Sequence, residues 1–307
     1  MKGFLRRVVL SVQRRCTSFD SFVSRRESDS HANICGCSPI FILGAPRTGT
    51  TVLFLAMADG MCVSYVSNLM ALLPCWMVRM CACSRRVASG YRRGLVKSRY
   101  GYVPGMLSPN EAGALNSFWF CELPSDGHRK NVQRTFYEIE RLTGWPVLIK
   151  NVFNATRVEF LRSIFPQARF IVVKRDLLYA AQSILLARRK LQEKDRSWWS
   201  VPTPGWQKVE HRDPYYQVVW QVWATTRHIE ESLRDITNRV SVVHYEQFCV
   251  DPAGTLARCA RKLGIKLRTG SKTIAESILL RNTVRLPDNE WKELQDAQDS
   301  ILCQRTR

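Results

Sequence analysis

Four short runs of apolar, largely β-branched residues recur along the chain, at 39–44, 146–151, 169–175 and 239–246. Each run is almost continuously apolar, which is typical of strands buried on both faces of a parallel sheet. Apolar residues at helical spacing predict helices over 50–58, 156–164, 177–191 and 215–236. Strands that alternate with helices predict a three-layer α/β/α fold around a central parallel sheet, whose ligands bind at the carboxyl ends of the strands.

Two segments interrupt this alternation. Residues 61–135 form a long insertion after the first helix, and residues 195–216 form a second one that is crowded with Trp, Pro and Tyr. Residues 1–37 are rich in Arg and Ser, and we expect them to form a basic, poorly ordered extension. Because no internal repeat is visible, we expect a single domain over 38–307 with helical insertions.

The apolar pattern does not favour a secretory or membrane protein. The first thirty residues hold no apolar run long enough for a secretory signal. The longest apolar run begins at Met61, but it contains Ser64, Asn68, Pro74 and Arg79. A membrane span tolerates such residues poorly, so we expect buried core elements there. The expectation is a soluble, cytoplasmic protein, with organelle targeting by the basic N-terminus as the alternative.

The charge of the chain is strongly positive, with 46 Lys and Arg against 26 Asp and Glu and a net charge of +20. Such a field favours anionic partners, which include nucleotides, sulfated or phosphorylated substrates, nucleic acid and acidic membranes. Between Gly60 and Asn110 there is no acidic residue. The basic residues of this stretch are Arg79, Arg85, Arg86, Arg92, Arg93, Lys97 and Arg99. They form either a solvated basic face or a surface that guides anions.

The eleven cysteines are scattered and lack the paired CxxC spacing of a zinc site. Two Cys-x-Cys pairs occur, Cys35 with Cys37 and Cys81 with Cys83, and neither has the Cys-x-x-Cys spacing of a zinc site. We therefore expect no metal site, and buried thiols of this kind favour a reducing compartment.

The residues from Gly44 to Thr51, Gly-Ala-Pro-Arg-Thr-Gly-Thr-Thr, begin like a phosphate-binding loop of the form Gly-x-x-x-x-Gly-Lys-Ser/Thr. A strand ends at Gly44 and a helix begins at Thr50, so free backbone N–H groups point at an anion. Thr50 stands where a nucleoside-triphosphate site has its lysine, and Arg47 supplies positive charge from inside the loop. No later apolar run ends in a clear magnesium-binding Asp. The loop is thus predicted to bind phosphate without a metal.

This loop resembles the 5′-phosphosulfate-binding loop of PAPS-dependent sulfotransferases. PAPS is 3′-phosphoadenosine 5′-phosphosulfate, and these P-loop-like enzymes transfer its sulfuryl group to an acceptor hydroxyl or amine and release PAP. The resemblance implies a second signature that holds the 3′-phosphate, an Arg at a strand end followed eight residues later by a Ser. Arg175 and Ser183 have this spacing. Arginine suits the role because its planar guanidinium binds phosphate with two parallel hydrogen bonds.

The resemblance covers most of residues 39–265 and implies roles for further residues. The implied donor-binding residues are Arg47, Thr48, Gly49, Thr50, Thr51, Arg175, Ser183 and Tyr245. Tyr245 would lie against the adenine, although packing of a strand-end aromatic residue on the core is the alternative. Lys150 ends the strand that this family places near the transferring group.

Three departures from the family pattern stand beside these matches. Leu177 replaces a common Pro, Lys150-Asn151-Val152 replaces a Lys-Thr-His type triplet, and no Arg-Lys-Gly type motif occurs near the C-terminus. The position of an adenosine lid is therefore left open.

The acceptor needs a general base, and Glu111 is the candidate. The segment from Ser108 to Glu111, followed by an aromatic Phe-Trp, resembles a stretch of some bacterial carbohydrate-type sulfotransferases. A capping role at a helix N-terminus is the rival interpretation of Glu111, and His211 and Asp213 are the fallback bases. Five aromatic residues form either a lid over an acceptor such as a sugar or ordinary packing: Trp198, Trp199, Trp206, Tyr215 and Tyr216.

The sequence therefore predicts a sulfotransferase that uses PAPS and no metal, with Arg47, Glu111 and Lys150 as the catalytic residues. The expected acceptor is a carbohydrate or another small molecule, and no nucleic-acid partner is expected. A P-loop kinase or NTPase is one alternative, opposed by the missing lysine. A non-catalytic polyanion or nucleic-acid binder, suggested by the charge, and a degenerate sulfotransferase-like binding protein are the others.

Overall fold

A computed structural model of the chain describes residues 36–73, 76–78, 80–81, 103–121, 125–191, 198–268 and 278–303. The expected basic extension over 1–37 lies almost wholly outside the described residues. So do all seven basic residues of the acid-free stretch and residues 195–197 of the second insertion.

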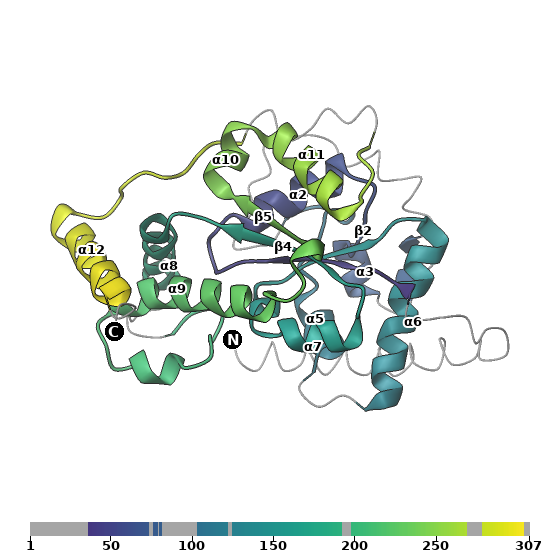
Figure 1. Ribbon diagram of the computed structural model, residues 1–307, viewed down its shortest axis with the longest axis horizontal. Helices are drawn as coiled ribbons and strands as arrows, with labels where there is room; N and C mark the ends of the chain where they lie inside the picture. The colour runs from purple at the N-terminus through teal and green to yellow at the C-terminus, as the bar shows by residue number, and fades with distance from the viewer. Residues whose placement is uncertain are drawn as a thin grey trace.

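Five parallel strands form one sheet in the order β2-β3-β1-β4-β5 (Figure 1). The strands are β1 (Ile40–Leu43), β2 (Ser64–Tyr65), β3 (Val147–Lys150), β4 (Arg169–Lys174) and β5 (Val240–His244). Four of them lie where the apolar runs predicted strands, and the predicted parallel sheet is confirmed. The pattern missed β2, an edge strand inside the expected first insertion, because two residues are too few to show a period.

Alternate residues of each strand point to opposite faces, so the sheet has a core on each side. Phe41 and Leu43 belong to one core, and Ile40 and Ile42 belong to the other. The first core is shared with α5 (Gly113–Trp119), α6 (Asp126–Thr143) and α7 (Val158–Ile164). The second core is shared with α2 (Thr50–Gly60), α10 (Tyr245–Val250) and α11 (Pro252–Leu263). Helices therefore cover both faces, as the predicted three-layer fold requires (Figure 1).

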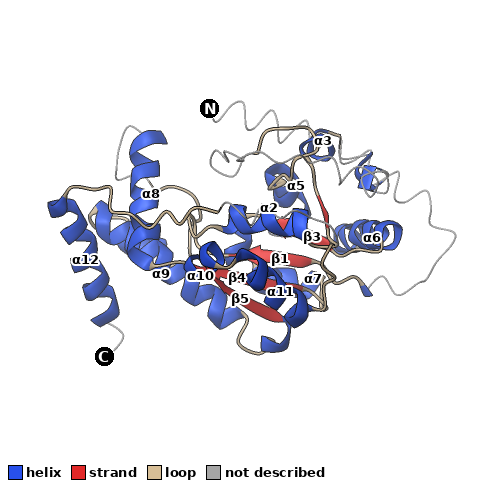
Figure 2. Ribbon diagram, turned by 90° about the horizontal axis from the view of Figure 1, so that it is seen from above, coloured by secondary structure: helices blue, strands red, loops and turns tan. Residues whose placement is uncertain are grey.

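Three further helices pack on one another around a third core: α8 (Leu177–Leu191), α9 (Pro214–Ser232) and α12 (Asp288–Cys303). In both views α8 and α12 lie at one end of the molecule and α6 at the other (Figures 1 and 2). The bounds of α8 agree with the prediction, whereas α9 ends four residues earlier than predicted. Since α8 begins directly after β4, its N-terminus lies at the carboxyl edge of the sheet.

The shorter elements are α3 (Asn68–Leu72), η4 (Val152–Thr156), η5 (Trp206–Val209) and η6 (Thr237–Arg239).

Among the described helices, none is long and apolar enough to cross a membrane. Of the cysteines discussed above, Cys37 and Cys81 are buried, and burial raises the pKa of Cys81 to about 12. Cys81 is therefore a protonated thiol near neutral pH. Its predicted neighbour Cys83 lies outside the described residues.

Candidate active site

The loop between β1 and α2 turns sharply at the carboxyl edge of the sheet. Arg47 and Gly49 both have left-handed backbone conformations, with φ of 69° and 95°. At Gly44 an added Cβ would lie 2.7 Å from Thr48 Oγ1 and 2.8 Å from the Val173 carbonyl oxygen, so only glycine fits. The Thr48 hydroxyl donates to the Ala45 carbonyl oxygen at 2.8 Å. Thr48 thus stabilises the turn from within the loop.

The first turn of α2 is open to an anion. The helix begins at Thr50, and among the described residues no side chain caps its N-terminus. Its first turn contains no acidic residue. The backbone N–H groups of a first helical turn lack partners within the helix and carry partial positive charge. A negatively charged group is therefore favoured at this end, and binding of phosphate by the loop stays a prediction.

Three of the predicted donor-binding residues meet beside this loop. The Nε–H of Arg47 donates to Ser183 Oγ at 2.9 Å. The guanidinium of Arg175 donates through Nη1 to the Arg47 carbonyl oxygen, also at 2.9 Å. Because β1 and β4 are neighbours in the sheet, the residues that follow them share one edge. The two sequence signatures, more than a hundred residues apart, form one cluster of cationic and hydroxyl groups.

Tyr245 packs between the loop and Arg175. The guanidinium carbon of Arg175 lies 4.7 Å from the centre of the Tyr245 ring, a cation–π distance. An added Cβ at Gly49 would lie only 2.4 Å from Tyr245 Cδ2. Burial raises the pKa of Tyr245 to about 12, and its hydroxyl donates to the Leu279 carbonyl oxygen at 3.4 Å. The ring is thus held as a neutral phenol against the phosphate-loop backbone.

Gly49→Ala is expected to destabilise the protein and to weaken binding of an anion at the loop. The left-handed backbone alone costs a non-glycine residue about 1–2 kcal/mol, and the added methyl group would also displace Tyr245. Chemical denaturation measures the change in the free energy of unfolding. The matched control is Gly127→Ala in α6, where the Cβ meets no close atom and stability is expected to stay equal or rise by about 0.4–1 kcal/mol. Equal stability of the Gly49→Ala and wild-type proteins would contradict this account of the loop.

A segment that the sequence did not single out closes over Arg175. Arg175 Nε–H donates to Asn282 Oδ1 at 2.9 Å, and Arg175 Nη2 donates to the Arg281 carbonyl oxygen at 2.8 Å. The segment is held against α8 by Gln182, whose Oε1 accepts the backbone N–H groups of Arg285 at 2.6 Å and Leu286 at 3.2 Å. Residues 278–286 therefore form part of the wall around Arg175.

A second cluster joins Lys150 to Glu111. Lys150 ends β3 and is 3% exposed, and its Nζ donates to Glu111 Oε1 in an ion pair. Thr51, in the first turn of α2, donates its hydroxyl to the same oxygen at 3.3 Å. Burial lowers the pKa of Lys150, the Glu111 carboxylate opposes this effect, and Arg47 adds to it. Thr51 and the electrostatic effect of Arg47 thus connect this cluster to the phosphate-binding loop.

The loop that carries the fallback bases and the aromatic residues is packed onto α8 and α9. Asp213 caps α9, since its Oδ1 accepts the backbone N–H of Tyr216 at 2.8 Å. Trp198 and Trp206 lie against each other with ring centres 5.3 Å apart, and Tyr216 is 5% exposed. Trp198, Trp199 and Tyr215 pack against the third core. The structure therefore gives the aromatic residues a packing role, which was one of the two interpretations of the sequence.

Buried Arg188 fixes the position of this loop. Its guanidinium donates to the side-chain oxygens of Gln217 at 2.8 Å and Gln221 at 3.3 Å, both on α9. Those two glutamines in turn donate to carbonyl oxygens at both ends of the loop, at Trp199, Val201, Glu210 and Arg212. No sequence motif marked these residues, because the burial of Arg188 and its contacts with glutamines 29 and 33 residues further along the chain arise only in the fold.

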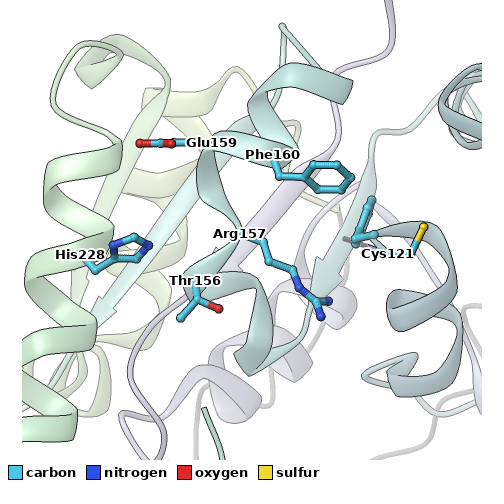
Figure 3. Close-up of a pocket in the computed structure, with 7 residues that line it drawn as sticks. Cys121, Thr156, Arg157, Glu159, Phe160 and His228 are labelled. Carbon is cyan, nitrogen blue, oxygen red and sulfur yellow. The ribbon is translucent and has the colours of Figure 1, made fainter. Parts of the chain in front are cut away.

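A cavity of about 270 Å³ lies between the end of α5, η4, α7 and α9 (Figure 3). Its lining residues are Phe120, Cys121, Thr156, Arg157, Glu159, Phe160 and His228. His228 extends from α9 towards the turn between η4 and α7 (Figure 3). The described residues that line the cavity include none of the predicted site residues, so the cavity is separate from the two clusters.

The two clusters together place cations, hydroxyl donors and one carboxylate at the ends of β1, β3 and β4. In the described part of the chain, no group of three or more His, Cys, Asp or Glu side chains is placed to hold a metal ion. A model of the sulfotransferase family matches residues 39–269. This match spans most of the chain, and the chain therefore belongs to the sulfotransferase family. The resemblance drawn from the sequence is confirmed.

Two solved structures illustrate the shared fold. The first is sulfotransferase STF9 from Mycobacterium avium, with a TM-score of 0.50 and 15% identity over 88% of this chain and 70% of that chain. The second is sulfotransferase STF1 from Mycobacterium tuberculosis H37Rv, with a TM-score of 0.50 and 15% identity over 92% of this chain and 76% of that chain. At this level of identity the likeness shows the fold alone. No curated protein sequence matches this chain significantly.

Proposed function

We propose that this sulfotransferase uses PAPS as its donor and transfers the sulfuryl group to a hydroxyl or amine of a carbohydrate or another small-molecule acceptor. The observation that carries the donor assignment is the meeting of Arg47, Ser183 and Arg175 beside the first turn of α2. A donor with phosphate-type groups at two separate positions needs two anion sites that share one edge of the sheet. The loop supplies one of these sites, and Arg175 with Ser183 supplies the other.

On the donor side, the backbone N–H groups of Gly49, Thr50 and Thr51 would hold the 5′-phosphosulfate together with the Arg47 guanidinium. Arg175 and Ser183 would hold the 3′-phosphate, and the Tyr245 ring would form a wall for the adenine. Guanidinium groups bind phosphate through paired N–H donors and retain their charge at all relevant pH values. Tyr245 is held by Gly49 and Arg175, so its ring position is fixed before any donor arrives.

On the acceptor side, Glu111 would take the proton as the acceptor oxygen or nitrogen forms its bond to sulfur. The bond between sulfur and the bridging oxygen breaks, and its electron pair leaves with PAP. Lys150 and Arg47 would stabilise the charge that develops on this leaving oxygen. In the free protein Lys150 forms an ion pair with Glu111, so its ammonium group already lies beside the proposed base. Transfer then depends mainly on positioning and on charge stabilisation.

The carbohydrate part of the proposal depends on the segment from Ser108 to Glu111 and its resemblance to carbohydrate-type sulfotransferases. The segment is held in place by Asn68, whose backbone N–H donates to the Ser108 carbonyl oxygen at 3.1 Å and whose Oδ1 accepts Asn110 Nδ2 at 2.5 Å. The aromatic residues of the loop over 198–216 give this acceptor class no support, because they pack on the third core.

The rate of transfer is expected to fall on the alkaline side at a pH below 10.5, the ordinary pKa of a lysine ammonium. Burial lowers the pKa of Lys150, and the ammonium loses its charge as pH rises through that lowered value. The measurement is kcat/KM for PAPS against pH, which reports the pKa values of groups in the free protein. In Lys150→Arg the alkaline limb should move to higher pH, because a guanidinium has a pKa above about 12. A wild-type rate that stays constant through pH 10.5 would contradict the role of Lys150.

Donor identity is tested by binding. Thermal unfolding is recorded with PAP alone, with ATP and Mg²⁺, and with mixed-sequence RNA at two salt concentrations. PAP at about 100 times its Kd should stabilise the native state by about 2.7 kcal/mol. A larger shift with ATP and Mg²⁺ would favour a kinase instead. Binding that depends steeply on salt and occurs only with RNA would favour a polyanion-binding protein.

A further inference from the structure

Two segments of the proposed site are linked to each other at three successive points. One segment runs from Glu111 to Asn116, at the start of α5, and the other runs from Lys150 to Asn154, at the end of β3 and in η4. The first link is the ion pair between Glu111 and Lys150. In the second link, Asn151 Nδ2 donates to the Glu111 carbonyl oxygen at 3.2 Å. The third link is a pair of side-chain amides, Asn116 and Asn154.

The amide pair is reciprocal and buried. Asn116 Nδ2 donates to Asn154 Oδ1 at 3.0 Å, and Asn154 Nδ2 donates to Asn116 Oδ1 at 3.1 Å. Asn116 is 1% exposed and Asn154 is 0% exposed. A buried amide that loses its partner costs roughly 1–3 kcal/mol, so the pair is favourable only while both hydrogen bonds are intact. These bonds restrict sliding of α5 along η4 in a way that an apolar contact of the same size does not.

Glu111 needs such support from outside its own segment. The next residue, Ala112, has a φ of 50°, a left-handed conformation that costs a non-glycine residue about 1–2 kcal/mol. The turn is stabilised by Asn110, whose Oδ1 accepts the Ala112 backbone N–H at 2.6 Å. In turn, Asn110 Nδ2 donates to Asn68 Oδ1 at 2.5 Å. A segment with a strained backbone holds one conformation only where its surroundings enforce it.

We propose that the Asn116–Asn154 amide pair is a positioning device that sets the Glu111 carboxylate against Lys150. The proposal rests on the proposed function of Glu111 and Lys150 in sulfuryl transfer. Both asparagines act through other residues, so they are positioning residues. Glu111 lies five residues before Asn116, and Lys150 lies four residues before Asn154, so a shift of α5 relative to η4 moves the carboxylate relative to the ammonium. Misplacement of a reacting group by about 1 Å can cost a hundredfold in rate.

The test is the double variant Asn116→Ala/Asn154→Ala, which removes both amides and leaves neither one buried without a partner. We expect a folded protein with PAP affinity within about twofold of wild type and kcat lower by roughly ten- to hundredfold. The KM for PAPS should change little. The matched control is Thr203→Val/Thr225→Val, which removes another buried side-chain pair, 2.6 Å apart and remote from the site. Its kcat should equal that of wild type.

A second comparison separates positioning from general support of the fold. In a Glu111→Gln background, the double asparagine change should lower kcat little further, because the group that it positions has already been removed. A loss of the same size in both backgrounds would overturn the proposal, as would wild-type kcat in the folded double variant. The crystal structure of the double variant decides the point without activity. Glu111 displaced from Lys150 supports the positioning role, and an unchanged ion pair overturns it. A wild-type chain that transfers no sulfuryl group from PAPS overturns the proposed function instead.

Discussion

Arg47→Ala is expected to lower turnover by at least about two orders of magnitude, the loss typical of a removed oxyanion donor. Arg47 lies inside the phosphate-binding loop and brings the positive charge that lysine supplies in a nucleoside-triphosphate site. Its Nε–H bonds to Ser183, so its removal disturbs both anion sites. The measurement is the initial rate of radiolabelled sulfuryl transfer from PAPS at saturating acceptor. A near-normal rate in a folded Arg47→Ala protein would contradict the assignment.

The matched control for this change is Arg261→Ala. Arg261 is exposed in the last turn of α11, so its loss removes the same charge from a surface outside the site. Its turnover should equal that of wild type. The turnover of Arg47→Lys is expected to lie between those of Arg47→Ala and Arg261→Ala, because lysine keeps the charge but lacks the planar pair of donors. If turnover depended on net charge alone, Arg261→Ala would lower it as much as Arg47→Ala does. That result would indicate electrostatic steering in place of a contact.

Glu111→Gln is expected to lower kcat by about two to four orders of magnitude, because an amide cannot accept the proton of the acceptor. Glutamine keeps the size of the side chain and can still accept hydrogen bonds from Lys150 and Thr51, so the fold should be preserved. PAP affinity should stay within about threefold of wild type, since Glu111 is not one of the proposed donor-binding groups and the change leaves those groups in place. Titration calorimetry with PAP and single-turnover rates with PAPS measure the two quantities.

Glu231→Gln serves as the control for the carboxylate. Glu231 is 64% exposed on α9 and lies outside both clusters, so its replacement should leave kcat unchanged. Wild-type turnover in Glu111→Gln, with PAP affinity intact, would move the role of general base to another group. His211 would then be the first residue to replace, because Asp213 already caps α9.

The fold could be predicted from the sequence where apolar runs are long enough to read. The strands β1, β3 and β4 are almost wholly buried and give continuous apolar runs, which are typical of a parallel sheet. The edge strand β5 alternates between buried and exposed residues, with Val242 50% exposed, and was found because its valines extend the apolar run. The edge strand β2 left no such signal. Helix α12 was missed although Leu294, Ala297 and Ile301 recur on one helical face and Asp288 opens the first turn. This helical period is a readable signal in the sequence.

The candidate site could be predicted where it follows directly from strand ends. The residues that end or follow β1, β3 and β4 must share the carboxyl edge of a parallel sheet, and this is where the structure places Arg47, Lys150 and Arg175. Their binding and catalytic roles, which the family resemblance implies, stay predictions. Asn282 was not found, because its contact with Arg175 spans 107 residues and depends on how the segment over 278–286 folds back. Gln182 did offer a signal, since it interrupts an apolar helix face beside Ser183.

The amide pair of Asn116 and Asn154 shows the same limit. Asparagine is common in turns and at helix starts, so neither residue stands out in the sequence. The two asparagines are 38 residues apart along the chain, and they form a pair only because α5 and η4 pack together. The loop over 198–216 was singled out in the sequence, but its role was left open between a lid and packing. Only its contacts with α8 and α9 show that it packs on the third core.

The most direct test of the central claim is incubation of the protein with ³⁵S-labelled PAPS and a panel of sugar, phenol and lipid acceptors in buffer with EDTA. The account predicts a labelled sulfated product with at least one acceptor of the panel, with the sugars as the expected class, and release of PAP in equal amount. No labelled product from any acceptor, together with no binding of PAP, would contradict it.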